Sequence, residues 1–190
     1  ALAENTSIMD VGAGWNHSCA LTSTGRIACW GGNTFGQLGL GDNRDRGALA
    51  EDIIQPFSFV DLNERHVVQL AVGGNHNCVL FDDGQVSCWG ANSRGQLGLG
   101  DQENRGDSMD ETGPNLRTVS LGLGVTAIAI SAGAEHSCAH LDDNTVKCWG
   151  RGDSGQLGLG TDDDRGDNPN EMGDNLPVVR HSLASEIVLL

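Results

Sequence analysis

The stretch Gly12–Asp42, GAGWNHSCALTSTGRIACWGGNTFGQLGLGD, decides the fold of this 190-residue chain because it occurs three times. Its copies are Gly73–Asp101, GGNHNCVLFDDGQVSCWGANSRGQLGLGD, and Gly133–Thr161, GAEHSCAHLDDNTVKCWGRGDSGQLGLGT. The histidine that all three copies share recurs at intervals of 59 and 60 residues. A period of this length is typical of a propeller or solenoid, in which each unit buries its apolar face only against neighbouring units.

Each copy contains four short segments with the pattern of β-strands. The first alternates apolar residues, as at Met9 and Val11, and the second follows the shared histidine. A turn rich in Asp, Thr and Gly leads into the third, which ends at a tryptophan such as Trp30. We expect the fourth segments at residues 57–62, 117–121 and 177–180. Four strands per period correspond to one propeller blade, so the sequence predicts an all-β fold of three four-stranded blades in an open or partial propeller.

The repeat also predicts boundaries, with blades at residues 1–62, 63–121 and 122–183. Residues 184–190 resemble the start of a further blade or a donor strand, because they repeat the first-strand pattern. Closed propellers usually need about four to eight blades, so three blades leave two uncovered ends. Either the chain is a segment of a longer repeat protein, or copies join head to tail. For the second case we expect self-association through the apolar residues Ile187, Val188, Leu189 and Leu190 at one end and Ile8, Met9 and Val11 at the other.

The recurring pattern A-G-x-x-H-S-x-A-L, then D-G-x-V-x-x-W-G, then G-Q-L-G-x-G, resembles the regulator of chromosome condensation repeat family. The resemblance covers nearly the whole chain, and its motifs return in all three copies. It implies a β-propeller that presents loops and faces to other proteins. The best-known member of that family catalyses nucleotide exchange on a small nuclear GTPase, while others are inhibitors, receptor-like ectodomains or scaffolds.

The cysteines flank the hairpin turn symmetrically in every copy. Residues placed in this way lie opposite each other on antiparallel strands, with Cα atoms about 4.5–5.5 Å apart, which suits a disulfide. Metal binding is the alternative, but two cysteines beside one histidine lack a fourth ligand. Regular disulfides indicate an oxidising compartment and predict a secreted, extracellular protein, to which possible glycosylation sequons beginning at Asn5 and Asn16 lend support. The predicted pairs are Cys19 with Cys29, Cys78 with Cys88, and Cys138 with Cys148.

The net charge of −15 argues against nucleic acid and anionic membranes as partners, because both require a basic surface. No run of 18 apolar residues is present, so the sequence predicts no membrane insertion. Three loops, 42–52, 101–111 and 161–174, hold 15 of the 26 acidic residues and carry −11 of this charge. Clustered carboxylates suit calcium, yet no full calcium-loop spacing is present, which favours solvated loops with arginines tied to carboxylates. The candidate calcium ligands are Asp101, Glu103, Asp107, Asp162, Asp163, Asp164 and Asp167, and no other cofactor is indicated.

No arrangement of residues suggests catalysis. The shared histidines, His17, His76 and His136, stand at one repeat position and cannot converge, so we expect each to hydrogen-bond backbone of its own or the next blade. Arg-Gly-Asp triplets at 105–107 and 165–167 occupy equivalent loop positions and are interpreted as part of the loop fold. The sequence therefore favours a non-enzymatic extracellular structural or protein-binding module, with further copies or repeats, or another protein, as partner. The alternatives are a regulatory propeller, acting as an exchange factor or inhibitor, and a calcium-dependent adhesin.

Overall fold

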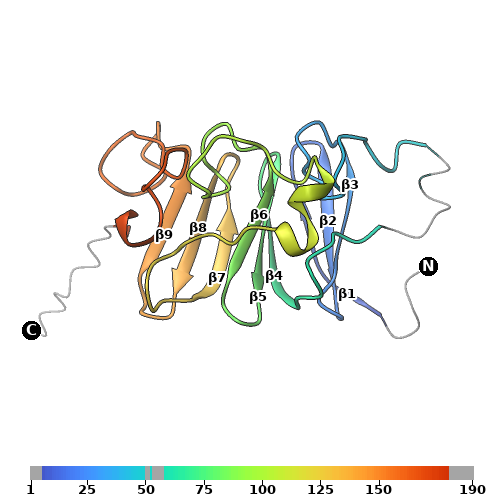
Figure 1. Ribbon diagram of the computed structural model, residues 1–190, viewed down its shortest axis with the longest axis horizontal. Helices are drawn as coiled ribbons and strands as arrows, with labels where there is room; N and C mark the ends of the chain where they lie inside the picture. Colours follow the sequence, from blue (N-terminus) through green and yellow to red (C-terminus); the bar gives the residue numbers. More distant parts are fainter. Residues whose placement is uncertain (1–5, 50–51, 53–57, 180–190) are drawn as a thin grey trace, which may run out of the picture.

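The computed structural model describes residues 6–49, 52 and 58–179, and within them the chain forms three antiparallel sheets side by side in chain order (Figure 1). We call these sheets blades 1, 2 and 3. Blade 1 contains β1 (Ile8–Ala13), β2 (His17–Thr22) and β3 (Ile27–Gly31); blade 2 contains β4 (Val67–Val72), β5 (His76–Phe81) and β6 (Val86–Gly90); blade 3 contains β7 (Ala127–Ala132), β8 (His136–Leu141) and β9 (Val146–Gly150). Short 3₁₀ turns, η1 (Met109–Glu111), η2 (Gly113–Asn115) and η3 (Gly173–Asn175), lie in the connecting loops. This confirms the all-β, open arrangement of blades.

The strand register is the same in all three blades. The middle strand of each blade pairs with both others, and its cysteine lies directly opposite the cysteine of the third strand. The first strand of each blade carries a bulge near its start, at the same place in the repeat. All three predicted cysteine pairs are bonded in the structure, with Cα–Cα distances of 4.1 Å: Cys19–Cys29, Cys78–Cys88 and Cys138–Cys148.

Within the described residues each sheet contains three strands, whereas the repeat predicted four. The fourth segment contacts its own blade through one isolated bridge in blades 1 and 2, and through the hydrogen bond from Val179 N–H to the Val146 carbonyl (2.7 Å) in blade 3. In blade 1, two residues after the bridging Phe59, the Asp61 carbonyl accepts a hydrogen bond from Gly113 N–H, which belongs to the loop of blade 2 (3.0 Å). A carbonyl used in this way does not extend its own sheet. The C-terminal strand expected at 184–190, and with it Ile187 to Leu190, lies outside the described residues.

The buried apolar side chains gather between blades, because a single three-stranded sheet has no interior of its own. At the junction of blades 1 and 2, the side chains that face blade 2 include both cysteines of blade 1, and at the next junction the cysteines of blade 2 face blade 3. Trp89 and Trp149 are 1% and 0% exposed at these two junctions. Each blade thus has one face for the preceding blade and one for the following blade.

The recurring GQLGLG turn brings loops of adjacent blades into contact. Gly36 has a φ of +74°, and a Cβ atom there would lie 2.5 Å from the backbone nitrogen of Asp107 in the next blade's loop. Gly41 N–H then donates to the Gly106 carbonyl at 3.0 Å. Glycine is needed here because it alone adopts this backbone conformation without strain while leaving room for a neighbouring chain.

In the described part of the chain, no helix has the length and apolar character needed to cross a membrane.

Candidate protein-binding faces

A buried polar relay crosses the junction between blades 1 and 2. His17 Nε2 lies 2.9 Å from Asn77 Oδ1, and Asn77 Nδ2 donates to the Gln37 carbonyl at 2.7 Å. The indole N–H of Trp89 donates to that same carbonyl at 3.1 Å. Because Asn77 uses its amide N–H towards Gln37, its Oδ1 is the acceptor, and His17 must carry its proton on Nε2.

The relay repeats between blades 2 and 3. His76 Nε2 lies 2.9 Å from Ser137 Oγ, which donates to the Gln96 carbonyl at 2.9 Å, and Trp149 Nε1 donates to that carbonyl at 3.0 Å. The expectation of a backbone partner for the histidines was therefore wrong for His17 and His76. Their partner is a side chain of the next blade. The residue that follows the shared histidine of that blade, Asn77 or Ser137, points back towards the preceding blade.

Burial keeps these junction histidines neutral. Desolvation, together with the neighbouring His17 and His136, lowers the pKa of His76 to about 3. Burial also lowers the pKa of His17, against an opposing hydrogen bond to Asn77. A charged imidazole at this place would lose its hydration without gaining a carboxylate partner.

The preceding face of blade 1 leaves uncovered what the junctions bury. Val11 is 66% exposed, whereas Leu70 and Ile130 at the same position of blades 2 and 3 are 7% and 6% exposed. Ile8 likewise is 47% exposed and Val67 is 2% exposed. Met9 differs, since its equivalents in the other blades are exposed too, so it does not belong to this face.

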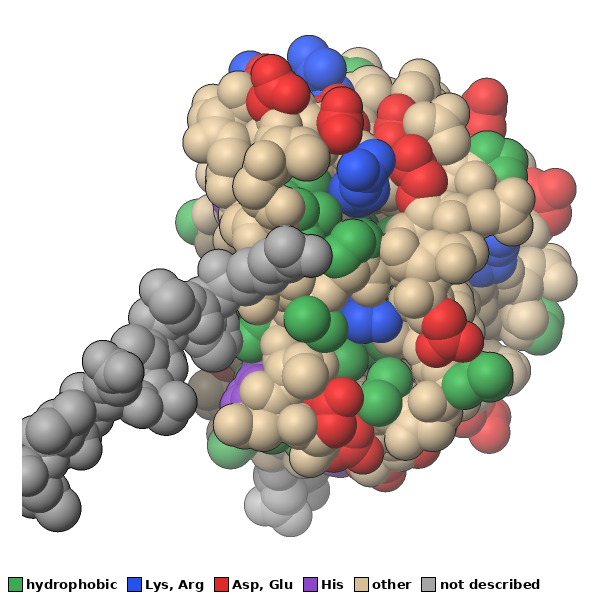
Figure 2. Space-filling view, turned by 90° about the vertical axis from the view of Figure 1, so that its left-hand side faces the viewer, with side chains coloured by type: hydrophobic (Ala, Val, Ile, Leu, Met, Phe, Trp, Pro, Cys, Tyr) green, Lys and Arg blue, Asp and Glu red, His purple; other side chains and the backbone are tan. Residues whose placement is uncertain are grey.

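Among the described residues no further blade packs on the following face of blade 3, and this face is more polar than the following faces of blades 1 and 2 (Figure 2). His140 stands where blades 1 and 2 carry the buried leucines Leu21 and Leu80. Figure 2 looks onto this end and shows hydrophobic side chains in the middle of the face, with acidic side chains towards its rim. Within the described residues, the ring of His136 has no hydrogen-bond partner such as Asn77 or Ser137 provides to the other two histidines.

Four of the predicted calcium ligands, Asp162, Asp163, Asp164 and Asp167, line one open pocket together with Arg94 and Arg165. Among the residues that the structure describes, no three His, Cys, Asp or Glu side chains are placed to hold a metal ion. Asp101 instead accepts hydrogen bonds from Arg105 (2.8 Å) and Arg117 (3.2 Å). Asp163 and Asp164 accept hydrogen bonds from arginines, and Asp167 accepts one from the Gln102 amide. Glu103 and Asp162 are exposed, and Asp107 follows an Arg-Gly turn.

The acidic loops follow the same edge of all three blades (Figure 1) and contact each other. Gln102 Nε2 of the loop 101–111 donates to Asp167 Oδ2 of the loop 161–174 at 3.0 Å. Their Arg-Gly-Asp triplets shape the loops, since Gly106 N–H donates to Glu111 Oε2 (3.0 Å) and the equivalent Gly166 donates to a glutamate in the same way. Asn16 of the second sequon is exposed, and Asn5 of the first lies outside the described residues.

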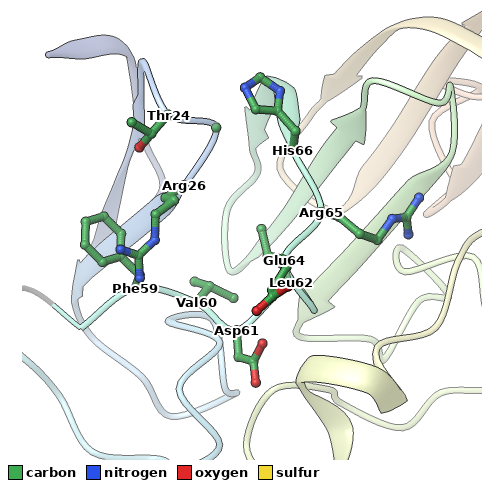
Figure 3. A pocket seen from close by; sticks show the side chains of 10 residues that line it. Thr24, Arg26, Phe59, Val60, Asp61, Leu62, Glu64, Arg65 and His66 are labelled. Carbon is green, nitrogen blue, oxygen red and sulfur yellow. The ribbon is translucent and has the colours of Figure 1, made fainter. Parts of the chain in front are cut away.

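A pocket of about 500 Å³ lies between blades 1 and 2 (Figure 3). Figure 3 shows Arg26 lying over Phe59 on one side and His66 across the gap, while Arg65 turns away from them. The Arg26 guanidinium carbon is 3.7 Å from the centre of the Phe59 ring. Sequence reasoning did not single out these residues. The available signal was the departure from the repeat, because blade 2 has Gln85 in place of Arg26.

Two family models, both described as the regulator of chromosome condensation (RCC1) repeat, match the chain. One covers residues 8–37, 67–96 and 127–156, and the other covers residues 24–80 and 83–140. The chain belongs to the regulator of chromosome condensation repeat family.

Relatives in this family are much longer than the chain. The ultraviolet-B receptor UVR8 of Arabidopsis thaliana is 31% identical over 155 residues, which are 82% of this chain and 32% of the relative. The probable E3 ubiquitin-protein ligase HERC6 of Homo sapiens is 35% identical over 158 residues, which are 83% of this chain and 14% of the relative. The chain therefore spans a third or less of the length of these relatives.

Solved structures show the same fold. Human WBSCR16 superposes with a TM-score of 0.68 at 24% identity, over 96% of this chain and 42% of that protein. Prp20p from Saccharomyces cerevisiae superposes with a TM-score of 0.67 at 22% identity, over 93% of this chain and 39% of that protein. At these identities the likeness establishes the fold alone.

Proposed function

We propose that this chain is a non-enzymatic protein-binding module of an extracellular compartment, and that its two end faces bind blades of its own kind. The observation that carries this proposal is the contrast between Val11, which is exposed, and Leu70 and Ile130, which are buried by a preceding blade. Covering such an apolar residue stabilises by about 1.5–3 kcal/mol, and an uncovered strand with apolar side chains tends to pair. A further blade would bury this face, as blade 1 buries the preceding face of blade 2 and blade 2 buries the preceding face of blade 3.

The two ends also carry complementary halves of the polar relay. His136 on the following face of blade 3 has no hydrogen-bond partner among the described residues, and Ser18 of blade 1 occupies the position of Asn77 and Ser137. If blade 1 of a second copy stacks on blade 3, its Ser18 meets His136 as Ser137 meets His76. Such a head-to-tail contact is heterologous and produces a ring or a filament.

The extracellular assignment rests on the disulfides. Each closes the hairpin of its blade, and those of blades 1 and 2 lie within the junction cores. Bonds of this kind persist in oxidising compartments and are rare in the cytosol. Alkylation of native material followed by mass spectrometry tests the assignment, since six labelled cysteines would reject it.

The family supports a protein partner without naming one. The yeast neighbour Prp20p is described with binding properties to Gsp1p and histones, and UVR8 is a receptor. No observation on this chain favours nucleotide exchange. The acidic edge of the blades would repel a partner with an acidic surface.

Sedimentation velocity of the 190-residue chain from low micromolar to millimolar concentration tests the end faces. We expect concentration-dependent association that Val11→Glu abolishes. Leu123→Glu is the matched control, because it adds the same charge at an apolar residue that is 88% exposed on a connecting turn. A chain that stays monomeric throughout, or that associates equally in the Val11→Glu variant, rejects the end faces as binding surfaces.

A further inference from the structure

The pocket between blades 1 and 2 has a rigid backbone frame. Val60 N–H donates to the Ile27 carbonyl at 2.9 Å, and Val67 N–H donates to the Gly25 carbonyl at 3.1 Å. These two bonds hold the β2–β3 turn of blade 1 against the segment that leads into blade 2. A preformed concave site of about 500 Å³ falls within the usual size of ligand pockets.

Arg26 is the exception among the arginines that the structure describes. In a protein of net charge −15, every other described arginine pairs with a carboxylate, whereas Arg26 stacks on Phe59 and has no ion pair with a residue that the structure describes. The stacked ring covers one face of the guanidinium and leaves the N–H groups at its edge free. The paired arginines are Arg44, Arg46, Arg65, Arg94, Arg105, Arg117, Arg151 and Arg165.

The fold does not require these side chains. The same backbone frame recurs at the junction of blades 2 and 3, where Val119 N–H donates to the Val86 carbonyl at 2.8 Å and Ala127 N–H donates to the Gly84 carbonyl at 2.9 Å. There, neutral side chains take the places of the cation, the ring and the imidazole. The replacements are Gln85 for Arg26, Thr118 for Phe59, and Thr126 for His66.

We propose that this pocket binds a carboxylate group, carried by a small molecule or by an Asp or Glu side chain of a partner polypeptide. Arg26 supplies two parallel N–H donors, the geometry that a carboxylate accepts. His66 lines the opposite wall and offers a further donor. Asp61 and Glu64 also line the pocket, and their charge repels a multiply charged anion such as phosphate more strongly than a single carboxylate. The proposal is independent of the end faces.

Titration of the ¹⁵N-labelled chain followed by NMR tests this site. The probes are propionate and the capped tripeptide Gly-Asp-Gly, with capped Gly-Asn-Gly as the uncharged match and inorganic phosphate as the competing anion. We expect saturable shifts of the Thr24, Gly25 and Arg26 signals with millimolar affinity for propionate, weakening as salt is added. Tighter binding of the Asp peptide than of propionate assigns the carboxylate to a partner polypeptide, and equal binding assigns it to a small molecule.

Variants separate a built site from general charge attraction. Arg26→Gln should weaken binding at least tenfold, and Arg26→Lys, which keeps the charge but loses the forked geometry, should give an intermediate affinity. Arg94→Gln is the matched control, since it removes a cation that is already paired with Asp164, and it should leave the affinity unchanged.

Three results overturn the proposal. These are the absence of saturable shifts with both carboxylate probes at tens of millimolar, shifts that persist in the Arg26→Gln variant, and phosphate binding as tight as that of the carboxylates. The spectrum of each variant without probe shows whether the fold is intact, because the signals of blade 3 should not move.

Discussion

The junction between blades 2 and 3 and the open face of blade 1 carry side chains of one kind at equivalent repeat positions, in opposite surroundings. Ile130 packs against blade 2 and is 6% exposed, while Val11 faces water and is 66% exposed. The same strand pattern therefore produces a core residue in one place and a surface residue in another. In a repeat protein the energetic importance of a side chain depends on whether a neighbouring unit covers it.

The two junctions also differ from each other. The junction of blades 2 and 3 has added polar ties, since the Gln69 side chain bonds both backbone groups of Ile130 and Lys147 Nζ donates to the Leu121 and Gly173 carbonyls at 2.8 Å. At the junction of blades 1 and 2, Asp10 stands in the place of Gln69 and Ser87 in the place of Lys147. The first junction instead carries the Arg26 pocket. One apolar stacking scheme thus accommodates different polar chemistry at each junction.

The largest effect should come from truncating a junction residue. Ile130→Ala should lower the free energy of unfolding by about 2–5 kcal/mol, because it leaves a cavity between blades. Val11→Ala should change it by less than about 0.5 kcal/mol in the dilute monomer. Urea unfolding followed by tryptophan fluorescence measures both. Equal losses would mean that Val11 is already covered in the monomer.

Removing a disulfide should destabilise a blade more where its face is covered by a neighbouring blade than where that face is open. Replacing Cys138 and Cys148 by Ser should cost about 3 kcal/mol from the released hairpin loop alone. The same change at Cys78 and Cys88 should cost more, since those sulfurs lie in a junction core although the loop has the same sequence separation of 10. Thermal unfolding of the two double variants checks the order. An equal loss would show that the sulfurs add no junction packing.

Lowering the pH should weaken the junctions. His76 has a folded pKa of about 3 against an ordinary value of 6.5, so the unfolded chain binds the proton first as the pH falls. Its contribution to stability is complete above pH 6.5 and is lost progressively below it, by about 2 kcal/mol at pH 5. Urea unfolding at several pH values should show this slope. His76→Gln should reduce this slope but not remove it, because burial also lowers the pKa of His17 and of His136, whereas His140→Gln at the open face should leave the slope unchanged.

The smallest effect concerns the polar tie across blades 2 and 3. Gln69→Ala removes two hydrogen bonds of 2.9 Å and should cost about 1–2 kcal/mol. Asp10→Ala at the same repeat position of blade 1 should cost a few tenths of that, because the Asp10 side chain bonds, among the described residues, only to the adjacent Val11 N–H. Chemical unfolding resolves the difference. A loss for Asp10→Ala as large as for Gln69→Ala would remove the assigned role of the tie.

The sequence alone determined the local architecture of each blade. The cysteine spacing predicted the hairpin partners, and the alternation at Val11 and its equivalents predicted the first strands, because both depend on contacts within about thirty residues. The fourth strand was overestimated in the described parts of the predicted segments, residues 58–62, 117–121 and 177–179, since sequence pattern does not show that a carbonyl such as that of Asp61 bonds to the next blade.

Only the tertiary structure decided which face of each blade is covered and where the polar side chains meet. His17 and Asn77 are 60 residues apart, and the Arg26 pocket joins two blades, so neither follows from local periodicity. Burial depends on the neighbour that packs against a surface, and this neighbour is far away in the chain. For that reason the repeat predicted three like units, while the structure alone separated their junctions from their open ends.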